Sequence, residues 1–336
     1  MRSISLLLLA LLCVAPVCAG VRVLPQDSGV KVRLRGISAV SADVAWASGR
    51  EGTVLRTVDG GKHWHVIKVP DAEALDFRDI EGFDADHAVV LSIGPGQASR
   101  VYRTVDGGKS WTLALQNHDE HAFFDCMAFD GQRGWMLGDP VGGRFQVYAT
   151  EDGGAQWRLL ETGPAAKQDE AAFAASGTCI ATTPWGERVA VSGGSAARVL
   201  LGDSGGKFWF AHDTPIPARV PAAGIFSATE MGKDMLLVGG DFEKESVGSA
   251  ARAQFESGEG LHMSALPAPR GYRSGAACTV EDKPQCIAVG PTGVDLLADA
   301  RWTAVSDTGY DAIDLSGDAG WASGADGRIA RIEIRK

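Results

Sequence analysis

The sequence has no cluster of basic residues, and its 42 Asp and Glu residues outnumber its 32 Lys and Arg residues. The resulting net charge of −10 gives a surface that repels phosphate backbones, so we expect no nucleic-acid partner. Cysteine is scarce, with six residues among 336. None lies in a CxxC or Cys/His pattern with the spacing of a zinc site, so we predict no metal and no cofactor.

Long apolar runs are also lacking, apart from a short one near the N-terminus. Arg2 precedes an apolar run over residues 4–14, and Val17-Cys18-Ala19 resembles a small-residue cleavage site. This is the layout of a secretory signal peptide, and the run is shorter than the roughly 20 residues that cross a bilayer. We predict a signal peptide over residues 1–19 and one domain over residues 20–336 that does not span a membrane. The localisation would be periplasmic or extracellular, with an uncleaved N-terminal anchor as the alternative.

What the sequence has in abundance is glycine, with 43 residues, together with nine regularly spaced tryptophans. Three segments are nearly identical: residues 57–64 (TVDGGKHW), 104–111 (TVDGGKSW) and 150–157 (TEDGGAQW). Their aspartates are 47 and 46 residues apart, and a fixed period in this range predicts a propeller or a solenoid. Each segment joins two apolar strands, so the unit is a β-hairpin with an Asp-Gly-Gly turn.

The turn has a readable chemistry. The aspartate accepts hydrogen bonds from the following backbone N–H groups, the glycines adopt positive φ, and the tryptophan ring packs between neighbouring units. This pattern is that of the Asp-box, also called the bacterial neuraminidase repeat, which has a structural role and no catalytic one. The structural residues are expected to be Asp59, Trp64, Asp106, Trp111, Asp152 and Trp157.

A second strand that ends in a glycine turn recurs with the same period, as in residues 45–49, 134–138 and 320–324. Counting these strands gives seven units, and the 317 residues after residue 19 divide into about seven repeats. We therefore predict an all-β, seven-bladed β-propeller with four-stranded antiparallel blades. The last unit is one strand short, so we expect the N-terminal strand around residues 21–24 to complete it and close the ring.

Four cysteines lie outside the predicted signal peptide, and an even number in an exported protein permits disulfides. Cys278 and Cys286 flank a hairpin bend at opposed positions, which predicts a cross-strand disulfide. Cys126 and Cys179 are expected on inner strands of neighbouring blades. For that pair, a disulfide and two buried free thiols are equally good interpretations.

The three boxes, the Gly-Trp-Ala-Ser-Gly type of second strand at residues 320–324 and the predicted export resemble the photosystem II stability/assembly factor family. The resemblance covers nearly all of residues 20–336, and its motifs are specific for the fold. It implies a seven-bladed propeller that assists the assembly of a membrane complex by binding protein. Residues 124–126, 138–140 and 240–242 depart from the family pattern, so the photosystem partner itself does not follow.

Propeller geometry places the loops that lead into the inner strands on the same face as the turns between second and third strands. Basic residues that converge there predict a site for an anion or a carboxylate, although salt bridges between blades would use the same residues. A metal site at His118, His121 and Asp125 is a weaker alternative. The candidate binding residues are Arg35, Arg78, Asp125, Asp139, Arg219, Asp241, Tyr272 and Arg273.

The sequence leaves two main functions open. The first is a non-catalytic propeller that binds a protein partner, such as a membrane complex. The alternative is a glycoside hydrolase of sialidase type, in which Arg35, Arg219 and Arg273 would bind a carboxylate and Tyr272 would be the nucleophile. Arg35 is followed by Gly-Ile-Ser instead of the sialidase Ile-Pro, and no glutamate is clearly placed beside Tyr272, so we favour the first function.

Overall fold

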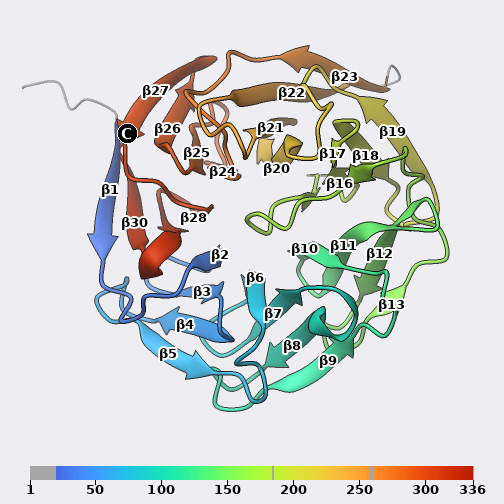
Figure 1. The fold of residues 1–336 in the computed structure, drawn as a ribbon. Helices are drawn as coiled ribbons and strands as arrows, with labels where there is room; N and C mark the ends of the chain where they lie inside the picture. The colour runs from blue at the N-terminus through green and yellow to red at the C-terminus, as the bar shows by residue number, and fades with distance from the viewer. Residues whose placement is uncertain (1–19, 184, 257–259, 336) are drawn as a thin grey trace, which may run out of the picture.

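The computed structural model describes residues 20–183, 185–256 and 260–335, so the predicted signal peptide lies outside the described residues. Within them, antiparallel sheets form seven blades around a central channel (Figure 1). The only helical segments described are two 3₁₀ turns, η1 (Gly96–Ala98) and η2 (Ala325–Gly327), and no described helix is long and apolar enough to cross a membrane. The prediction of an all-β, seven-bladed propeller is confirmed.

The first four blades follow the chain. Blade 1 contains β2 (Leu34–Ala39), β3 (Ala45–Gly49), β4 (Thr53–Thr57) and β5 (His65–Lys68). Blade 2 contains β6 (Asp76–Gly82), β7 (Ala88–Ile93), β8 (Arg100–Thr104) and β9 (Thr112–Gln116). Blade 3 contains β10 (Phe124–Asp130), β11 (Arg133–Val141), β12 (Arg144–Thr150) and β13 (Arg158–Leu159). Blade 4 contains β15 (Ile180–Thr182), β16 (Arg188–Val191), β18 (Arg198–Gly202) and β19 (Trp209–Asp213).

The last three blades include two additions to the simple order. Blade 5 contains β20 (Ala223–Met231), β21 (Asp234–Asp241), β22 (Gly248–Glu256) and β23 (Gly260–Ala265), and β17 (Gly193–Gly194) and β14 (Glu170–Ala171) extend its inner edge. Blade 6 contains β24 (Gly275–Cys278), β25 (Cys286–Gly290), β26 (Gly293–Ala298) and β27 (Arg301–Ser306). Blade 7 contains β28 (Ala312–Ser316), β29 (Ala319–Ser323), β30 (Ile329–Arg335) and β1 (Gly20–Gln26).

The ring is closed by its two ends. β1 pairs antiparallel with β30 over its whole length, from Gly20 opposite Arg335 to Gln26 opposite Ile329. The last blade therefore contains strands from both ends of the chain, as Figure 1 shows at β1 and β30. This pairing covers an edge of β30 that would otherwise present unpaired backbone groups.

The repeated turns have the hydrogen bonds that their residue types require. In the first turn, Asp59 Oδ1 accepts from His63 N at 3.0 Å, and Thr57 Oγ1 accepts from Gly61 N at 2.9 Å. The same pair of bonds recurs in the next two turns. In the fourth turn the sequence match has decayed, yet Asp203 Oδ1 accepts from Lys207 N at 2.7 Å and takes the same role. The hydrogen bond from the turn aspartate is therefore kept even where the rest of the sequence motif is not.

The core consists of apolar layers between adjacent blades. Trp46 and Trp321 are fully buried, and Trp321 meets Trp64 of blade 1 edge to face at a ring distance of 6.3 Å. Burial of such rings removes 150–250 Å² each from water and is a large part of propeller stability. Each box tryptophan thus helps to seal one blade against its neighbour.

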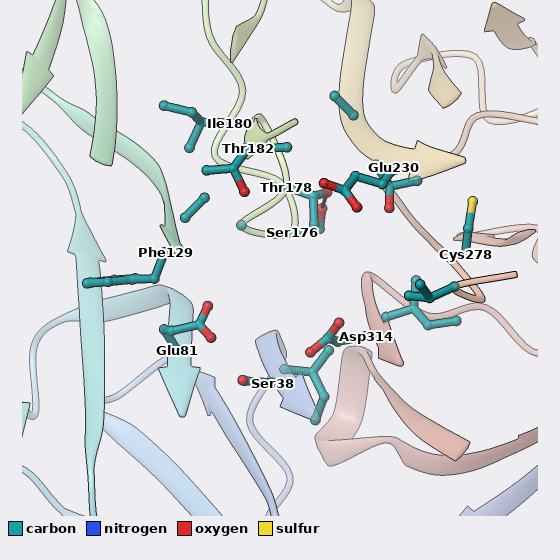
Figure 2. A pocket seen from close by; sticks show the side chains of 18 of the residues that line it. Ser38, Glu81, Phe129, Ser176, Thr178, Ile180, Thr182, Glu230, Cys278 and Asp314 are labelled. Atoms are coloured by element: carbon teal, nitrogen blue, oxygen red, sulfur yellow. Dashed lines mark hydrogen bonds between the residues drawn. The ribbon is translucent and has the colours of Figure 1, made fainter. Parts of the chain in front are cut away.

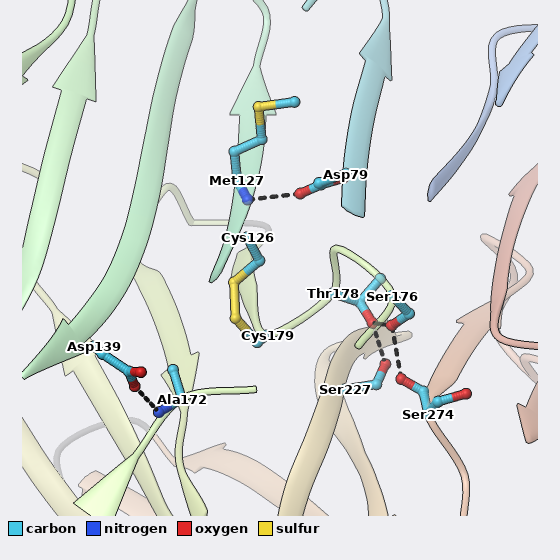
Figure 3. Close-up of a disulfide and its surroundings, with 10 residues drawn as sticks. All are labelled: Asp79, Cys126, Met127, Asp139, Ala172, Ser176, Thr178, Cys179, Ser227 and Ser274. Carbon is cyan, nitrogen blue, oxygen red and sulfur yellow. Dashed lines mark hydrogen bonds between the residues drawn. A yellow bond between two sulfur atoms is a disulfide. The ribbon is translucent and has the colours of Figure 1, made fainter. Parts of the chain in front are cut away.

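Two disulfides are present among the described residues. Cys278 and Cys286 face each other on β24 and β25, as predicted. Cys126 of β10 and Cys179, which directly precedes β15, join the inner edges of blades 3 and 4, and both are buried (Figure 3). The question that the sequence left open for this pair is therefore answered by a disulfide.

Candidate functional site

The central channel contains two cavities, one toward each face. The first, which we call the arginine cavity, has a volume of about 500 Å³ and opens where the inner strands begin. Its polar lining residues are Arg33, Arg35, Arg78, Asp125, Asp139, Glu245, Tyr272 and Asp311. Its wall also contains Phe173, Phe226 and Phe242. A ligand here would meet guanidinium groups and aromatic rings together.

Two of the three arginines are held by carboxylates. Arg33 donates two hydrogen bonds of 2.7 Å to Asp311, and this interaction raises the pKa of Arg33. Arg78 Nη2 lies 3.0 Å from an oxygen of Asp76, and its Nη1 donates to the carbonyl of Ala174 at 2.7 Å. The bonds of Arg33 link blades 1 and 7, as the salt-bridge interpretation expects, whereas Arg78 and Asp76 lie on the same strand, β6.

Arg35 differs because its positive charge is poorly compensated. Its nearest carboxylate oxygen, on Asp311, is 3.6 Å away, and its buried Nε has no hydrogen-bond partner. Burial and the neighbouring Arg78 lower the pKa of Arg35 to about 10. A buried cation with an unused donor is stabilised by an anion that supplies both the charge and the acceptor.

A buried acid lines the same cavity from blade 3. Asp125 is 1% exposed, and its Oδ2 has no hydrogen-bond partner. Burial, with the nearby charge of Asp139, raises the pKa of Asp125 well above its usual range. Burial also raises the pKa of Asp139, whose Oδ1 accepts from Ala172 N at 3.0 Å. A protonated Asp125 leaves the arginines less fully neutralised than a count of residues suggests.

The aromatic wall is well ordered. Phe173 and Phe226 stack with their ring centres 3.9 Å apart, and Phe242 meets both rings edge to face. Tyr272 meets Phe226 at 4.7 Å, and burial raises its pKa, so the phenol stays protonated at neutral pH. An apolar side chain can pack here while a neighbouring carboxylate reaches the arginines.

The second cavity, which we call the acidic cavity, has a volume of about 630 Å³ and opens where the inner strands end (Figure 2). Asp79, Glu81, Glu230 and Asp314 are among its lining residues, and no described lysine or arginine lines it. Burial raises the pKa of Asp79 to about 7 and that of Asp314 to about 6. Burial and the neighbouring acids also raise the pKa of Glu81.

One segment separates the two cavities. Residues 172–178 run from β14 toward Cys179, and we call them the plug. The first four line the arginine cavity, and Ser176, Gly177 and Thr178 line the acidic cavity. Figure 1 shows this part of the chain reaching from between blades 4 and 5 into the channel.

The structure brings together five of the eight binding residues named from the sequence: Arg35, Arg78, Asp125, Asp139 and Tyr272. The other three lie elsewhere. Arg219 lines a separate shallow cavity beside Lys167, and Asp241 is buried with its carboxylate held by Glu243 N and Lys244 Nζ. Arg273 is fully buried and forms an ion pair with Asp295.

These positions correct two expectations. Arg35, Arg219 and Arg273 do not converge, because Arg219 belongs to a remote loop and the guanidinium of Arg273 is neutralised inside blade 6. The arginine triad of the sialidase alternative is therefore not assembled. His118 and His121 are exposed and line neither cavity, and the described residues contain no cluster of three or more acids, histidines or cysteines that could hold a metal.

Sequence reasoning missed Arg33, Asp311 and the phenylalanine wall. Arg33 precedes β2 by one residue and could have been found from its position in the same loop as Arg35. Phe242 belongs to a Gly-Asp-Phe motif that departs from the family pattern, which was a usable signal. Phe173 lies in the plug, which has no counterpart in the repeat and carried no signal.

Comparisons with known proteins agree on the fold. No family model matches the sequence, and no curated protein matches it. Among solved structures, "YCF48 bound to D1 peptide" is 15% identical with a TM-score of 0.65, covering 96% of this chain and 100% of that one. YCF48 from Cyanidioschyzon merolae is 20% identical with a TM-score of 0.66, covering 94% and 99%.

A third similar structure is an enzyme. It is a catalytically inactive histidine-to-alanine variant of virginiamycin B lyase from Staphylococcus aureus with quinupristin, 13% identical with a TM-score of 0.67, covering 94% of this chain and 100% of that one. At these identities the likeness establishes a shared propeller fold and no shared activity. The fold and the two cavities thus define a seven-bladed propeller with an arginine-lined channel mouth.

Proposed function

We propose that this chain is an exported, non-catalytic propeller that binds a protein partner and acts as an assembly or stability factor for a membrane or periplasmic complex. The proposed ligand is a peptide segment that places a carboxylate on Arg35 and an apolar side chain against the phenylalanine wall. The observation that carries this proposal is the poorly compensated guanidinium of Arg35, with its unpartnered Nε, in a cavity lined by aromatic rings.

Three further findings support the proposal. The similar structure of YCF48 is described as bound to a D1 peptide, so this fold does accommodate a peptide ligand. The two disulfides are typical of an oxidising compartment and agree with export by the predicted signal peptide. No histidine is among the residues that line the two cavities, whereas the similar lyase is described as inactive after a histidine is replaced by alanine.

The test is a binding titration with a fluorescent alanine peptide that ends in phenylalanine with a free carboxylate. Because a charge-assisted bond to Arg35 would be lost, Arg35→Gln should weaken binding by about 10- to 100-fold. Arg219→Gln is the matched control, since Arg219 lies outside the arginine cavity, and its affinity should equal that of the wild type. Equal binding by Arg35→Gln and the wild type would refute the proposed site.

A second comparison tests the carboxylate itself. The same peptide with a C-terminal amide keeps the phenylalanine ring but lacks the negative charge. We expect the amide to bind the wild type about tenfold more weakly than the acid does. The acid and the amide should bind Arg35→Gln with equal affinity. If the amide peptide binds the wild type as tightly as the acid peptide, the aromatic wall accounts for binding and Arg35 does not bind the carboxylate.

A further inference from the structure

The plug is held by blades on several sides of the channel. Arg78 of blade 2 donates to the carbonyl of Ala174 at 2.7 Å, and Asp139 of blade 3 accepts from the N–H of Ala172 at 3.0 Å. On the other side, Thr178 Oγ1 donates to Ser227 Oγ of blade 5 at 2.7 Å. A connection that only joined β14, at the edge of blade 5, to β15 of blade 4 would not need the bonds to blades 2 and 3.

The C-terminal end of the plug, residues 176–178, is fixed most firmly (Figure 3). Ser176 Oγ donates to the carbonyl of Ser274 at 2.7 Å, which links the plug to blade 6. Gly177 has φ of +83°, and a Cβ there would lie 2.2 Å from Asp79 Oδ1, so only glycine allows this approach. Cys179 ends the segment with a disulfide to Cys126. The plug is therefore held in the channel by specific contacts, and we call its side-chain hydrogen bonds from Ser176 and Thr178 the latches.

The contact between Ala174 and Arg78 has a consequence for ligand binding. A backbone carbonyl occupies a guanidinium N–H in the same cavity that contains Arg35. A ligand carboxylate that binds Arg78 through Nη1 must displace the carbonyl, whereas the buried Nε of Arg78 has no hydrogen-bond partner. Phe173 of the plug also fills part of the aromatic wall through its stack on Phe226.

We propose that residues 172–178 form an autoinhibitory plug that occupies the arginine cavity through Ala174 and is held in place by its latches, Ser176 and Thr178, beside the acidic cavity. The plug lowers ligand affinity at the arginine cavity. Movement of residues 176–178 frees residues 172–175, and Ala174 then releases Arg78. This regulation rests on the proposed function, because it concerns the ligand of the same cavity.

The test uses the full chain with Ser176→Ala/Thr178→Val, which removes both latches and leaves the residues of the arginine cavity unchanged. Thr182→Val is the matched control, because Thr182 lines the acidic cavity but belongs to β15 and not to the plug. The first measurement is the rate at which phenylglyoxal modifies Arg78, followed by mass spectrometry with Arg219 as the internal reference. The second is the affinity for the alanine peptide that ends in phenylalanine.

We expect Arg78 to react about fivefold faster and the peptide to bind about three- to tenfold more tightly in the double variant, with the control unchanged. An unchanged Arg78 rate in a folded double variant would overturn the plug. Faster Arg78 modification with unchanged or weaker peptide binding would overturn autoinhibition. If neither the wild type nor any variant binds the peptide, the proposed function fails. The Arg78 modification rate then tests by itself whether the plug covers Arg78. If the double variant does not fold, Thr178→Val is measured in the same way.

Discussion

The two ends of the central channel are built from the same inner strands but carry opposite chemistry. β2 contributes Arg35 to the arginine cavity and Ser38 to the acidic cavity, and β6 contributes Arg78 to the first and Glu81 to the second. At the arginine end, carboxylates are present to neutralise most of the charge. At the acidic end, no lysine or arginine is among the described lining residues, and burial raises the pKa values of Asp79, Glu81 and Asp314 instead.

This difference shows how a symmetric scaffold produces an asymmetric site. Residues three apart on one inner strand reach opposite ends of the channel, so each end can diversify without changing the blade core. The plug then keeps the two ends apart. Substitutions that leave the contacts of residues 172–178 unchanged can therefore alter one end of the channel without altering the other, and the following experiments use such substitutions.

The largest effect is expected where an arginine is structural. Arg273 is fully buried against Asp295 and donates to the carbonyl of Tyr272 at 2.8 Å, behind the wall of the arginine cavity. Arg273→Met leaves the buried Asp295 with Arg270 as its remaining partner, so unfolding free energy should fall by about 3–5 kcal/mol. Guanidinium chloride denaturation measures the change. A loss below that of an ordinary surface substitution would show that Arg273 is not part of the scaffold.

The two disulfides are expected to differ in their contribution to stability. The bond between Cys126 and Cys179 closes a separation of 53 residues and fixes the end of the plug, whereas Cys278–Cys286 closes only 8 residues beside the acidic cavity. Loop entropy predicts losses of about 4 kcal/mol and about 2.5 kcal/mol when each pair is replaced by alanine. Thermal unfolding of the two double variants tests the order, and equal losses would contradict the entropic account.

The acidic end should make stability depend on pH. Asp79 and Asp314 have native pKa values of about 7 and about 6, above the values of exposed aspartates, so the native state holds more protons than the unfolded state. Their contribution is therefore full at low pH and is lost as pH rises through about 6 to 7. Asp314→Asn should raise the melting temperature by a few degrees at pH 8 relative to the wild type, with little difference at pH 5. A larger increase in melting temperature at pH 5 than at pH 8 would contradict the predicted direction of the pH dependence.

The smallest effect is expected in the repeated turns. Asp106 is only partly buried, and its hydrogen bonds with Ser110 lower its pKa to about 2. Asp106→Asn keeps an acceptor for the Ser110 N–H and loses only the charge, so the melting temperature should stay close to that of the wild type. Neither peptide affinity nor the pH profile should move, because this turn lies away from both cavities.

The repeat, the hairpin turns and the seven blades could be predicted because their chemistry is local. Thr57, Asp59 and Gly61 satisfy one another within a single turn, so the sequence alone specifies the geometry. Arg35 and Arg78 could be placed at one face for the same reason, since each lies on an inner strand with a known direction. Arg219 was placed wrongly because it lies in the irregular chain before β20, where the period gives no position.

The plug could not be predicted because its structure depends on non-local partners. Ser176 and Thr178 bond to blades 6 and 5, and Gly177 lies so close to Asp79 of blade 2 that a Cβ would not fit. None of these contacts has a spacing that repeats along the chain. The acidic cavity escaped notice for a similar reason, since Asp79, Glu81 and Asp314 come together only when the ring closes.

The central claim is that a carboxylate-bearing peptide enters the arginine end and not the acidic end of the channel. Hydrogen–deuterium exchange of the full chain, with and without the alanine peptide that ends in phenylalanine, tests this claim most directly. The account predicts changed exchange in residues 33–35, 76–78 and 172–175, and unchanged exchange in residues 279–282, which border the acidic cavity. Protection confined to residues 279–282, or to the outer strands of the blades, would contradict it.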